Sequence, residues 1–179
     1  MRDVADAARI RRFMRALGVE ADVPARVYFT GGATAVLLGW RASTIDVDIK
    51  MVPETDRLFR AIPQIKESLH LNVELASPAD FVPVRAGWEE RSPFIAQDGR
   101  VAFHHFELCA QALAKTERSH RQDVEDLREM IGRGLVTPTG VWEYFGSIES
   151  DLYRYPALDP RSFKKALEEI FGARPASQP

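Results

Sequence analysis

A pair of glycines followed by two alternating aspartates constrains this chain more than any other feature. Gly31 and Gly32 precede a short apolar stretch, and Asp46 and Asp48 then alternate with apolar residues. Successive side chains of a strand point to opposite faces, so the two aspartates project the same way, roughly 6.6 Å apart. Neighbouring carboxylates repel each other unless a cation lies between them, and Mg²⁺ binds one or two carboxylates together with substrate phosphates. The pattern predicts a strand that presents a metal-binding pair.

The residues between these two features suit the binding of phosphate. Gly31 and Gly32 would let backbone N–H groups approach a phosphate at a helix N-terminus, although a tight strand-to-helix turn alone would also need them. Arg41 would either clamp a phosphate or pair with a carboxylate, and Ser43 and Thr44 would line or order the connecting loop. A phosphate cradle beside metal-binding carboxylates indicates phosphoryl or nucleotidyl transfer.

Residues 27–50 resemble the signature of the DNA polymerase β-like nucleotidyltransferase superfamily, in which Gly-Gly or Gly-Ser is followed by Asp-x-Asp. The stretch is most similar to AbiEii-type toxin nucleotidyltransferases and their uncharacterised bacterial relatives in the form GGATAVLLGWRASTIDVDI. The resemblance implies an α+β nucleotidyltransferase fold, with a small mixed β-sheet flanked by helices and a C-terminal helical segment. It further implies NMP transfer from an NTP, with Mg²⁺ or Mn²⁺, to a hydroxyl of tRNA or another RNA, a protein or a small molecule. A role as a toxin with a cognate antitoxin belongs to the same set of expectations.

The resemblance also implies roles for two further side chains. Superfamily enzymes carry a hydroxyl at the position of Gly32, so Thr34 or a backbone amide would have to serve here. They use a third acidic residue as metal ligand or general base, and Glu74 on the polar face of a predicted strand is the candidate. We expect its carboxylate to converge with those of Asp46 and Asp48 on adjacent strands; an ordinary exposed glutamate is the alternative.

A charged stretch further along the chain resembles the K–R–KD–D helix motif of AbiEii-type proteins. Lys115 and Arg118 lie three apart on one helix face, from which both would reach a triphosphate. Asp123 resembles the acidic position of the motif and would position the lysine or the acceptor. On this view Lys115→Ala weakens nucleotide binding and leaves the melting temperature nearly unchanged. The alternative is a solvated helix laced by ion pairs.

The sequence predicts a catalytic core at residues 1–106, a helical region packed on it at 107–171 and a disordered tail at 172–179. Asp98-Gly99 between two β-prone runs predicts a hairpin, and proline after Thr137 and after Asp159 predicts two helix starts. The predicted helices are residues 3–17 with a stop at Gly18, 31–40, 55–69 with a kink or split at Pro63, 107–131 with a break near 119–120, 138–150 and 160–171. The predicted strands are residues 27–30, 45–52, 71–76, 92–97 and 100–105.

Composition limits the alternatives to this assignment. The net charge of −2 gives no global attraction to nucleic acid, which disfavours a nucleic-acid-binding adaptor. A single cysteine, Cys109, excludes an internal disulfide and fits a reducing compartment such as the cytoplasm, and no apolar run is long enough to span a membrane.

The main rival is a catalytically altered relative of the same fold that acts as a binding or antitoxin-like partner. The C-terminal aromatic residues are expected to form a core layer, with base stacking as the alternative. His104 and His105 are consecutive, so only one of them can face a given site.

Overall fold

The computed structural model describes residues 3–176, which form two compact units. The first unit comprises the chain up to Ser77 together with Ser92–Phe106, and the second comprises Pro78–Arg91 together with the chain from Glu107 onward. The predicted division at residue 106 assigned 78–91 to the core, whereas the structure groups this segment with the helices. Of the predicted disordered tail, residues 172–176 have no regular secondary structure and 177–179 lie outside the described residues.

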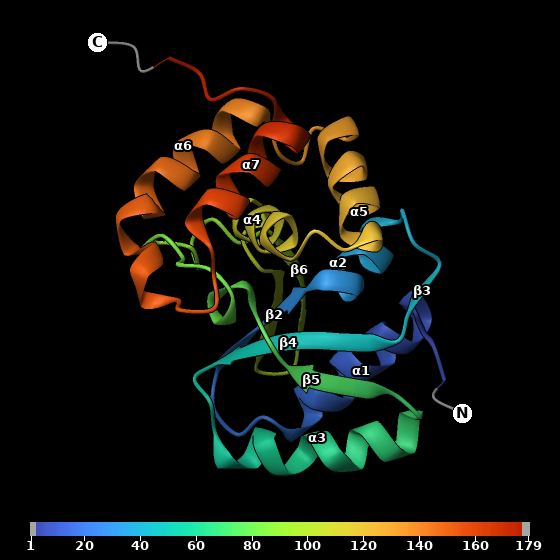
Figure 1. Cartoon of the computed structure of the whole chain (residues 1–179). Helices are drawn as coiled ribbons and strands as arrows, with labels where there is room; N and C mark the ends of the chain where they lie inside the picture. Colours follow the sequence, from blue (N-terminus) through green and yellow to red (C-terminus); the bar gives the residue numbers. More distant parts are fainter. Residues whose placement is uncertain (1–2, 177–179) are drawn as a thin grey trace. The chain divides into compact units, whose positions relative to one another are not determined.

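The first unit is built on a five-stranded mixed sheet of order β5-β4-β2-β7-β6 (Figure 1). Strand β2 pairs antiparallel with β4 and parallel with β7, while β4 pairs parallel with β5. This confirms the predicted α+β class with a small mixed sheet. The strands are β1 (Ala5–Asp6), β2 (Ala25–Thr30), β3 (Ser43–Thr44), β4 (Asp46–Val52), β5 (Asn72–Leu75), β6 (Phe94–Asp98) and β7 (Val101–His105), and the helices are α1 (Ala7–Glu20), α2 (Gly31–Leu38) and α3 (Asp56–Leu69).

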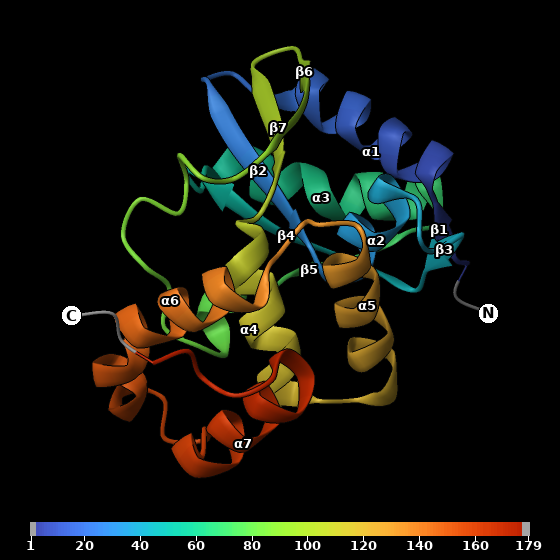
Figure 2. The same cartoon turned by 90° about the horizontal axis from the view of Figure 1, so that it is seen from above.

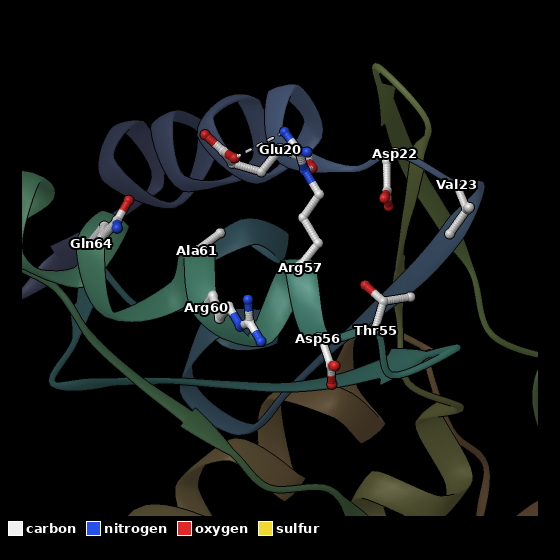
Figure 3. A pocket seen from close by; sticks show the side chains of 9 residues that line it. All are labelled: Glu20, Asp22, Val23, Thr55, Asp56, Arg57, Arg60, Ala61 and Gln64. Carbon is white, nitrogen blue, oxygen red and sulfur yellow. Dashed lines mark hydrogen bonds and ion pairs between the residues drawn. The ribbon is translucent and has the colours of Figure 1, made fainter.

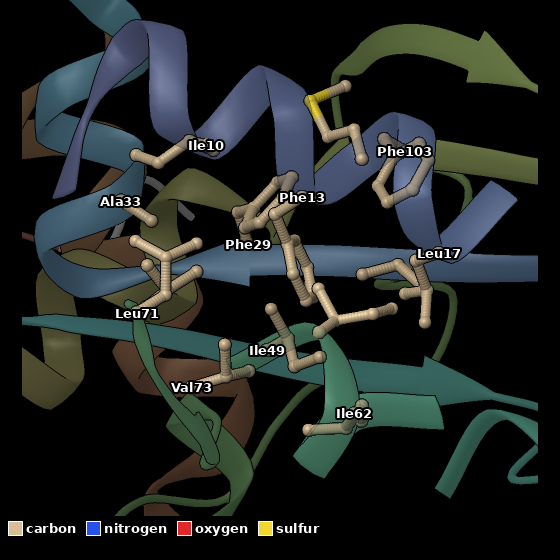
Figure 4. Packing of buried hydrophobic residues seen from close by; sticks show 14 of the residues in the cluster. Ile10, Phe13, Leu17, Phe29, Ala33, Ile49, Ile62, Leu71, Val73 and Phe103 are labelled. Carbon is tan, nitrogen blue, oxygen red and sulfur yellow. The ribbon is translucent and has the colours of Figure 1, made fainter. Parts of the chain in front are cut away.

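Helices α1 and α3 cover one face of this sheet (Figure 2), and the apolar side chains of both layers pack together there (Figure 4). Phe13 of α1 meets Phe29 of β2 edge to face, with ring centroids 6.3 Å apart. Along β4, Val47 and Ile49 are buried in this core, whereas the alternate residues Asp46, Asp48 and Lys50 are only half-buried. The alternation therefore places the polar side chains of β4 on the opposite face of the sheet.

Several helix predictions in the first unit differ from the structure. Helix α1 begins at Ala7, since the predicted helical residues 5–6 form strand β1, and α2 ends at Leu38 and not at residue 40. Helix α1 continues through Gly18 to Glu20, because the glycine serves a contact and not a helix stop: a Cβ there would lie 2.5 Å from the carbonyl oxygen of Asp98. Helix α3 runs unbroken through Pro63. The hairpin at Asp98-Gly99 is confirmed, with Gly99 at φ +55°, a conformation that favours glycine.

The second unit consists of helices α4 (Leu108–Arg118), α5 (Arg121–Gly132), α6 (Pro138–Ile148) and α7 (Pro160–Phe171), with 3₁₀ turns η1 (Pro78–Asp80) and η2 (Glu149–Arg154). The predicted break falls at Ser119, which adopts φ +52°. Thr137 and Asp159 cap α6 and α7 as predicted. Of the C-terminal aromatic residues, Trp142, Tyr144 and Phe145 are buried as a core layer, but Tyr153 is 75% exposed. Among residues 3–176 there is no helix with the length and apolar character needed to cross a membrane.

A buried carboxylate explains why 78–91 belongs to the helical unit. Glu107, 4% exposed, accepts hydrogen bonds from the Arg91 guanidinium and from the Tyr144 hydroxyl, the latter at 2.7 Å. The Tyr144 oxygen in turn accepts the backbone N–H of Arg85 at 3.0 Å. These partners are far apart in sequence, so no local sequence pattern predicts their contacts.

Candidate active site

The predicted metal-binding aspartates lie on one face of the sheet in the first unit. Asp48 is paired with Glu74 across the parallel strands β4 and β5, and Asp46 is paired with Asn72. Paired residues of parallel strands project to the same side, so the three acidic side chains share the face opposite the apolar core. Asp46 and Asp48 are half-buried and Glu74 is exposed.

Asn72 joins two of these carboxylates and was missed as a site residue. Its side-chain amide donates to Oδ1 of Asp46 at 2.5 Å and to Oε1 of Glu74 at 3.1 Å. The alternation of residues 71–76 puts Asn72 on the polar face, which is the signal that would have identified it. The amide orients both acceptors toward itself and thereby fixes their positions.

The expected convergence of three carboxylates is not found in the described part of the chain. Within residues 3–176 no group of three His, Cys, Asp or Glu side chains is arranged to hold a metal ion. Two carboxylates two residues apart on one strand nevertheless suit Mg²⁺, which takes one or two carboxylates and completes its shell with phosphate oxygens and water. Asp46 and Asp48 are the residues that fit such an ion.

The glycine turn is packed directly against these residues. Gly31 adopts φ +60°, and a Cβ there would lie 2.9 Å from Oδ2 of Asp48. A Cβ on Gly32 would lie 2.0 Å from Oγ1 of Thr44 and 3.3 Å from Nη1 of Arg41. Both glycines are thus required by the close approach of neighbouring side chains. A carboxylate, a hydroxyl and a guanidinium converge on the first turn of α2.

Two other predicted side chains have structural roles in the first unit. Thr34 is 1% exposed, and its hydroxyl donates to the carbonyl of Phe29 at 3.2 Å and contacts Nδ1 of His105 at 3.1 Å. It therefore belongs to the interior and does not replace a hydroxyl at the surface of the turn. Ser43 pairs with Asp6 in the short β1–β3 ladder.

The charged residues of the α4–α5 motif form an ion cluster in the second unit, in which Lys115 and its two aspartates are buried and Arg118 is exposed. Nζ of Lys115 lies 2.6 Å from Asp126 and 3.7 Å from Asp123, and the lysine is only 5% exposed. Arg118 binds both oxygens of Asp123, at 2.8 and 2.5 Å. Burial opposes ionisation of Asp123, but the hydrogen bond and charge of Arg118, with the charge of Lys115, lower its pKa overall. The ion pairs of the alternative interpretation are present, but Lys115, Asp123 and Asp126 are buried and only Arg118 is exposed.

Asp126 ends the charged stretch, but no role was predicted for it from the sequence. It is completely buried, and its carboxylate is the nearest partner of Lys115. Its position three residues after Asp123 places both on one face of α5, which is the signal that was available. The prediction that Lys115→Ala leaves stability unchanged no longer fits, because the substitution would remove an ammonium that lies 2.6 Å from a completely buried carboxylate.

A pocket lies elsewhere in the first unit (Figure 3). It has a volume of about 640 Å³ and is lined by Glu20, Asp22, Val23, Thr55, Asp56, Arg57, Arg60, Ala61 and Gln64. It adjoins the start of α3, beyond the C-terminal end of β4, whereas Asp46 begins that strand. None of the predicted site residues lines it, and Arg57 is engaged by the carbonyl of Glu20 at 2.5 Å.

Comparison with known proteins identifies the family. Residues 7–137 match the family described as nucleotidyltransferase of unknown function (DUF6036). The chain belongs to this family. No curated protein and no solved structure matches the chain. The segment shared with the nucleotidyltransferase family contains the glycine turn, both aspartates, Glu74 and the α4–α5 cluster, whereas α6 and α7 follow it.

In this nucleotidyltransferase-family chain, the buried His105 should make the free energy of unfolding depend on pH. Burial, together with the charge of His104, lowers the pKa of His105 from 6.5 to about 4. Between these values the unfolded chain binds a proton that the folded chain excludes, so stability falls as pH falls through this window. The expected loss is about 3 kcal/mol, beginning below pH 6.5 and complete below about pH 4.

Urea unfolding between pH 4 and 7 measures this effect. His105→Phe keeps an apolar-compatible side chain on the buried face and should flatten the pH profile in this window. His104→Asn, on the neighbouring half-buried position, is the matched control and should retain most of it, because burial is the larger cause of the lowered pKa of His105. An unchanged profile in His105→Phe would show that other groups cause the dependence.

Proposed function

We propose that this chain transfers a nucleoside monophosphate from an NTP to an acceptor hydroxyl, with Mg²⁺ or Mn²⁺ held by Asp46 and Asp48. The observation that supports this most is the convergence of Asp48, Thr44 and Arg41 on the glycine turn of a nucleotidyltransferase-family chain. A guanidinium, a hydroxyl and a helix N-terminus are ligands for phosphate oxygens. The adjacent carboxylates are ligands for the metal that accompanies a triphosphate.

In the proposed reaction the acceptor oxygen forms a bond to the α-phosphorus while the bond to the β-phosphate oxygen breaks. Pyrophosphate leaves, and the acceptor proton passes to a base, for which Glu74 is the candidate. A bound divalent ion supplies neutralisation of the phosphate charge. Asn72 orients Oε1 of Glu74, and Arg41 balances the charge of the departing pyrophosphate.

The finer assignments come from the AbiEii-type resemblance. It suggests an RNA end, including that of tRNA, a protein side chain or a small molecule as acceptor, and a toxin role with a cognate antitoxin. The roles that it implies for Lys115, Arg118 and Asp123 in nucleotide binding stay predictions. The structure adds that these side chains are held in place by one another and by Asp126.

A second candidate is a catalytically altered family member that acts as a binding or antitoxin-like partner. The placement of the Asn72 amide between Asp46 and Glu74 favours it, since this amide occupies two carboxylates that a metal or base role would use. The two candidates differ in whether the chain binds and consumes an NTP.

A labelled-nucleotide experiment distinguishes them. The full chain is incubated with each [α-³²P]NTP, Mg²⁺ and fractionated cellular RNA, protein and metabolites, and we expect label in one fraction together with released pyrophosphate. The same reaction with [γ-³²P]NTP is the control, because nucleotidyl transfer leaves the γ-phosphate in pyrophosphate and labels no acceptor. Calorimetry that detects no Mg²⁺-dependent NTP binding would favour the partner protein.

A further inference from the structure

His105 lies on the apolar face of the sheet, an unusual place for an imidazole. It ends β7, is paired with Phe29 of β2 and is only 5% exposed. Its side chain points to the same side as those of Val101 and Phe103, both completely buried. A buried polar ring requires a hydrogen-bond partner, because an unmet polar group there is costly.

That partner is Thr34, and the geometry determines which atom donates. Nδ1 of His105 lies 3.1 Å from Oγ1 of Thr34. The Thr34 hydroxyl donates to the carbonyl of Phe29 at 3.2 Å. A hydroxyl carries one proton, so while that proton is donated to Phe29 the imidazole is the donor to Thr34, and we assign the ring proton to Nδ1 on this basis. The result is a chain of donors from His105 through Thr34 to Phe29.

This chain of hydrogen bonds spans the glycine turn. Phe29 precedes the turn and Thr34 follows it, so their bond closes a short loop around Gly31 and Gly32. Thr30, the N-cap residue of α2, makes no side-chain capping bond. The usual local device that fixes a first helical turn is therefore missing, and the buried bonds from β7 take its place. The backbone of Phe106 also donates to the Phe29 carbonyl, at 2.7 Å.

We propose that His105 is a positioning residue, which as the neutral Nδ1–H tautomer holds the Gly31–Gly32 turn in place for the nucleotide's phosphates through Thr34. Its action on the nucleotide rests on the proposed function. We call the hydrogen-bonded set of His105 Nδ1, the Thr34 hydroxyl and the Phe29 carbonyl the brace, and its existence does not depend on the proposed function.

The first arm of the test is the tautomer in the wild-type chain. With ¹⁵N-labelled histidine, long-range ¹H–¹⁵N spectra at pH 7 report which ring nitrogen is protonated, and loss of one signal set in His105→Asn assigns His105 among the four histidines. We expect a protonated Nδ1. In Thr34→Val, which keeps the shape but removes the hydroxyl, the Nδ1 signal should shift, whereas Thr34→Ser should keep it. Protonation at Nε2 in the wild-type chain would overturn the brace.

The second arm is Mg²⁺–NTP affinity by calorimetry. His105→Phe and Thr34→Val should each weaken binding by about tenfold, the equivalent of one hydrogen bond. His105→Asn, whose amide can donate from a position close to that of Nδ1, should restore most of it, and His104→Asn should bind as the wild type does. Wild-type affinity in His105→Phe would refute the positioning role. If the wild-type chain binds no NTP, the proposed function and the positioning role both fail. The tautomer measurement still tests independently whether the brace exists.

Discussion

Replacing both Asp46 and Asp48 with asparagine should lower nucleotidyl transfer on the order of a thousandfold or more. Asparagine keeps the size of each side chain but removes the charges that would hold a divalent ion. Folding should be unaffected within about 0.5 kcal/mol, because the half-buried asparagine at 46 can still accept the Asn72 amide. Removing the repulsion between the two carboxylates should also favour the folded state slightly.

Transfer of α-label and urea unfolding in metal-free buffer measure the two effects side by side. Glu54→Gln with Glu67→Gln removes two exposed charges from the same unit and is the matched control, which should change neither quantity. A double asparagine variant that unfolds more easily and retains transfer would mean that the aspartates are scaffold. Loss of transfer with unchanged stability is the signature of a catalytic pair.

Replacing Lys115 with methionine should destabilise the fold by about 3–5 kcal/mol. Methionine fills nearly the same volume but leaves the carboxylate of Asp126, 0% exposed, without the ammonium 2.6 Å away. Loss of the lysine should matter less for Asp123, because Arg118 binds both oxygens of its carboxylate. The large effect therefore comes from removing the cation that lies 2.6 Å from a completely buried carboxylate.

A second substitution separates this cause from lost packing. Adding Asp126→Leu to Lys115→Met removes the stranded charge and should recover most of the lost stability, as buried ion pairs replaced by apolar side chains often do. Lys165→Met is the control, since Lys165 is 78% exposed and its pair with Glu169 should contribute under about 0.5 kcal/mol. A double variant no more stable than Lys115→Met alone would assign the loss to packing.

Local patterns were sufficient where the determinants are themselves local. The alternation of β4, the Asp98-Gly99 turn and the proline-marked starts of α6 and α7 all depend on neighbouring residues, and the structure confirms them. Gly18 shows the limit of this reasoning. Its local signal was a helix stop, but its contact is with Asp98, eighty positions along the chain, and a long-range contact leaves no periodic trace.

In the candidate site too, features set by local spacing could be predicted from the sequence, whereas features set by long-range packing could not. The i,i+2 spacing of Asp46 and Asp48 predicts their shared face, and the strand pairing adds Glu74 opposite Asp48. The burial of Lys115 could not be predicted, because it depends on how α5 packs against α4. Its partner Asp126 comes from the facing helix, so a lysine that reads as a solvated cation is the centre of a buried cluster.

The chain passes between the two units three times, after residues 77, 91 and 106. Synthesis on the ribosome therefore delivers Pro78–Arg91 before the helices that hold it. Arg91 must wait for Glu107, and Arg85 for Tyr144, which is translated more than fifty residues later. No single cut of the chain releases the second unit whole. A truncation at residue 106 would keep the sheet but leave this segment without its partners, so expression of the first unit alone calls for replacing 78–91 with a short linker.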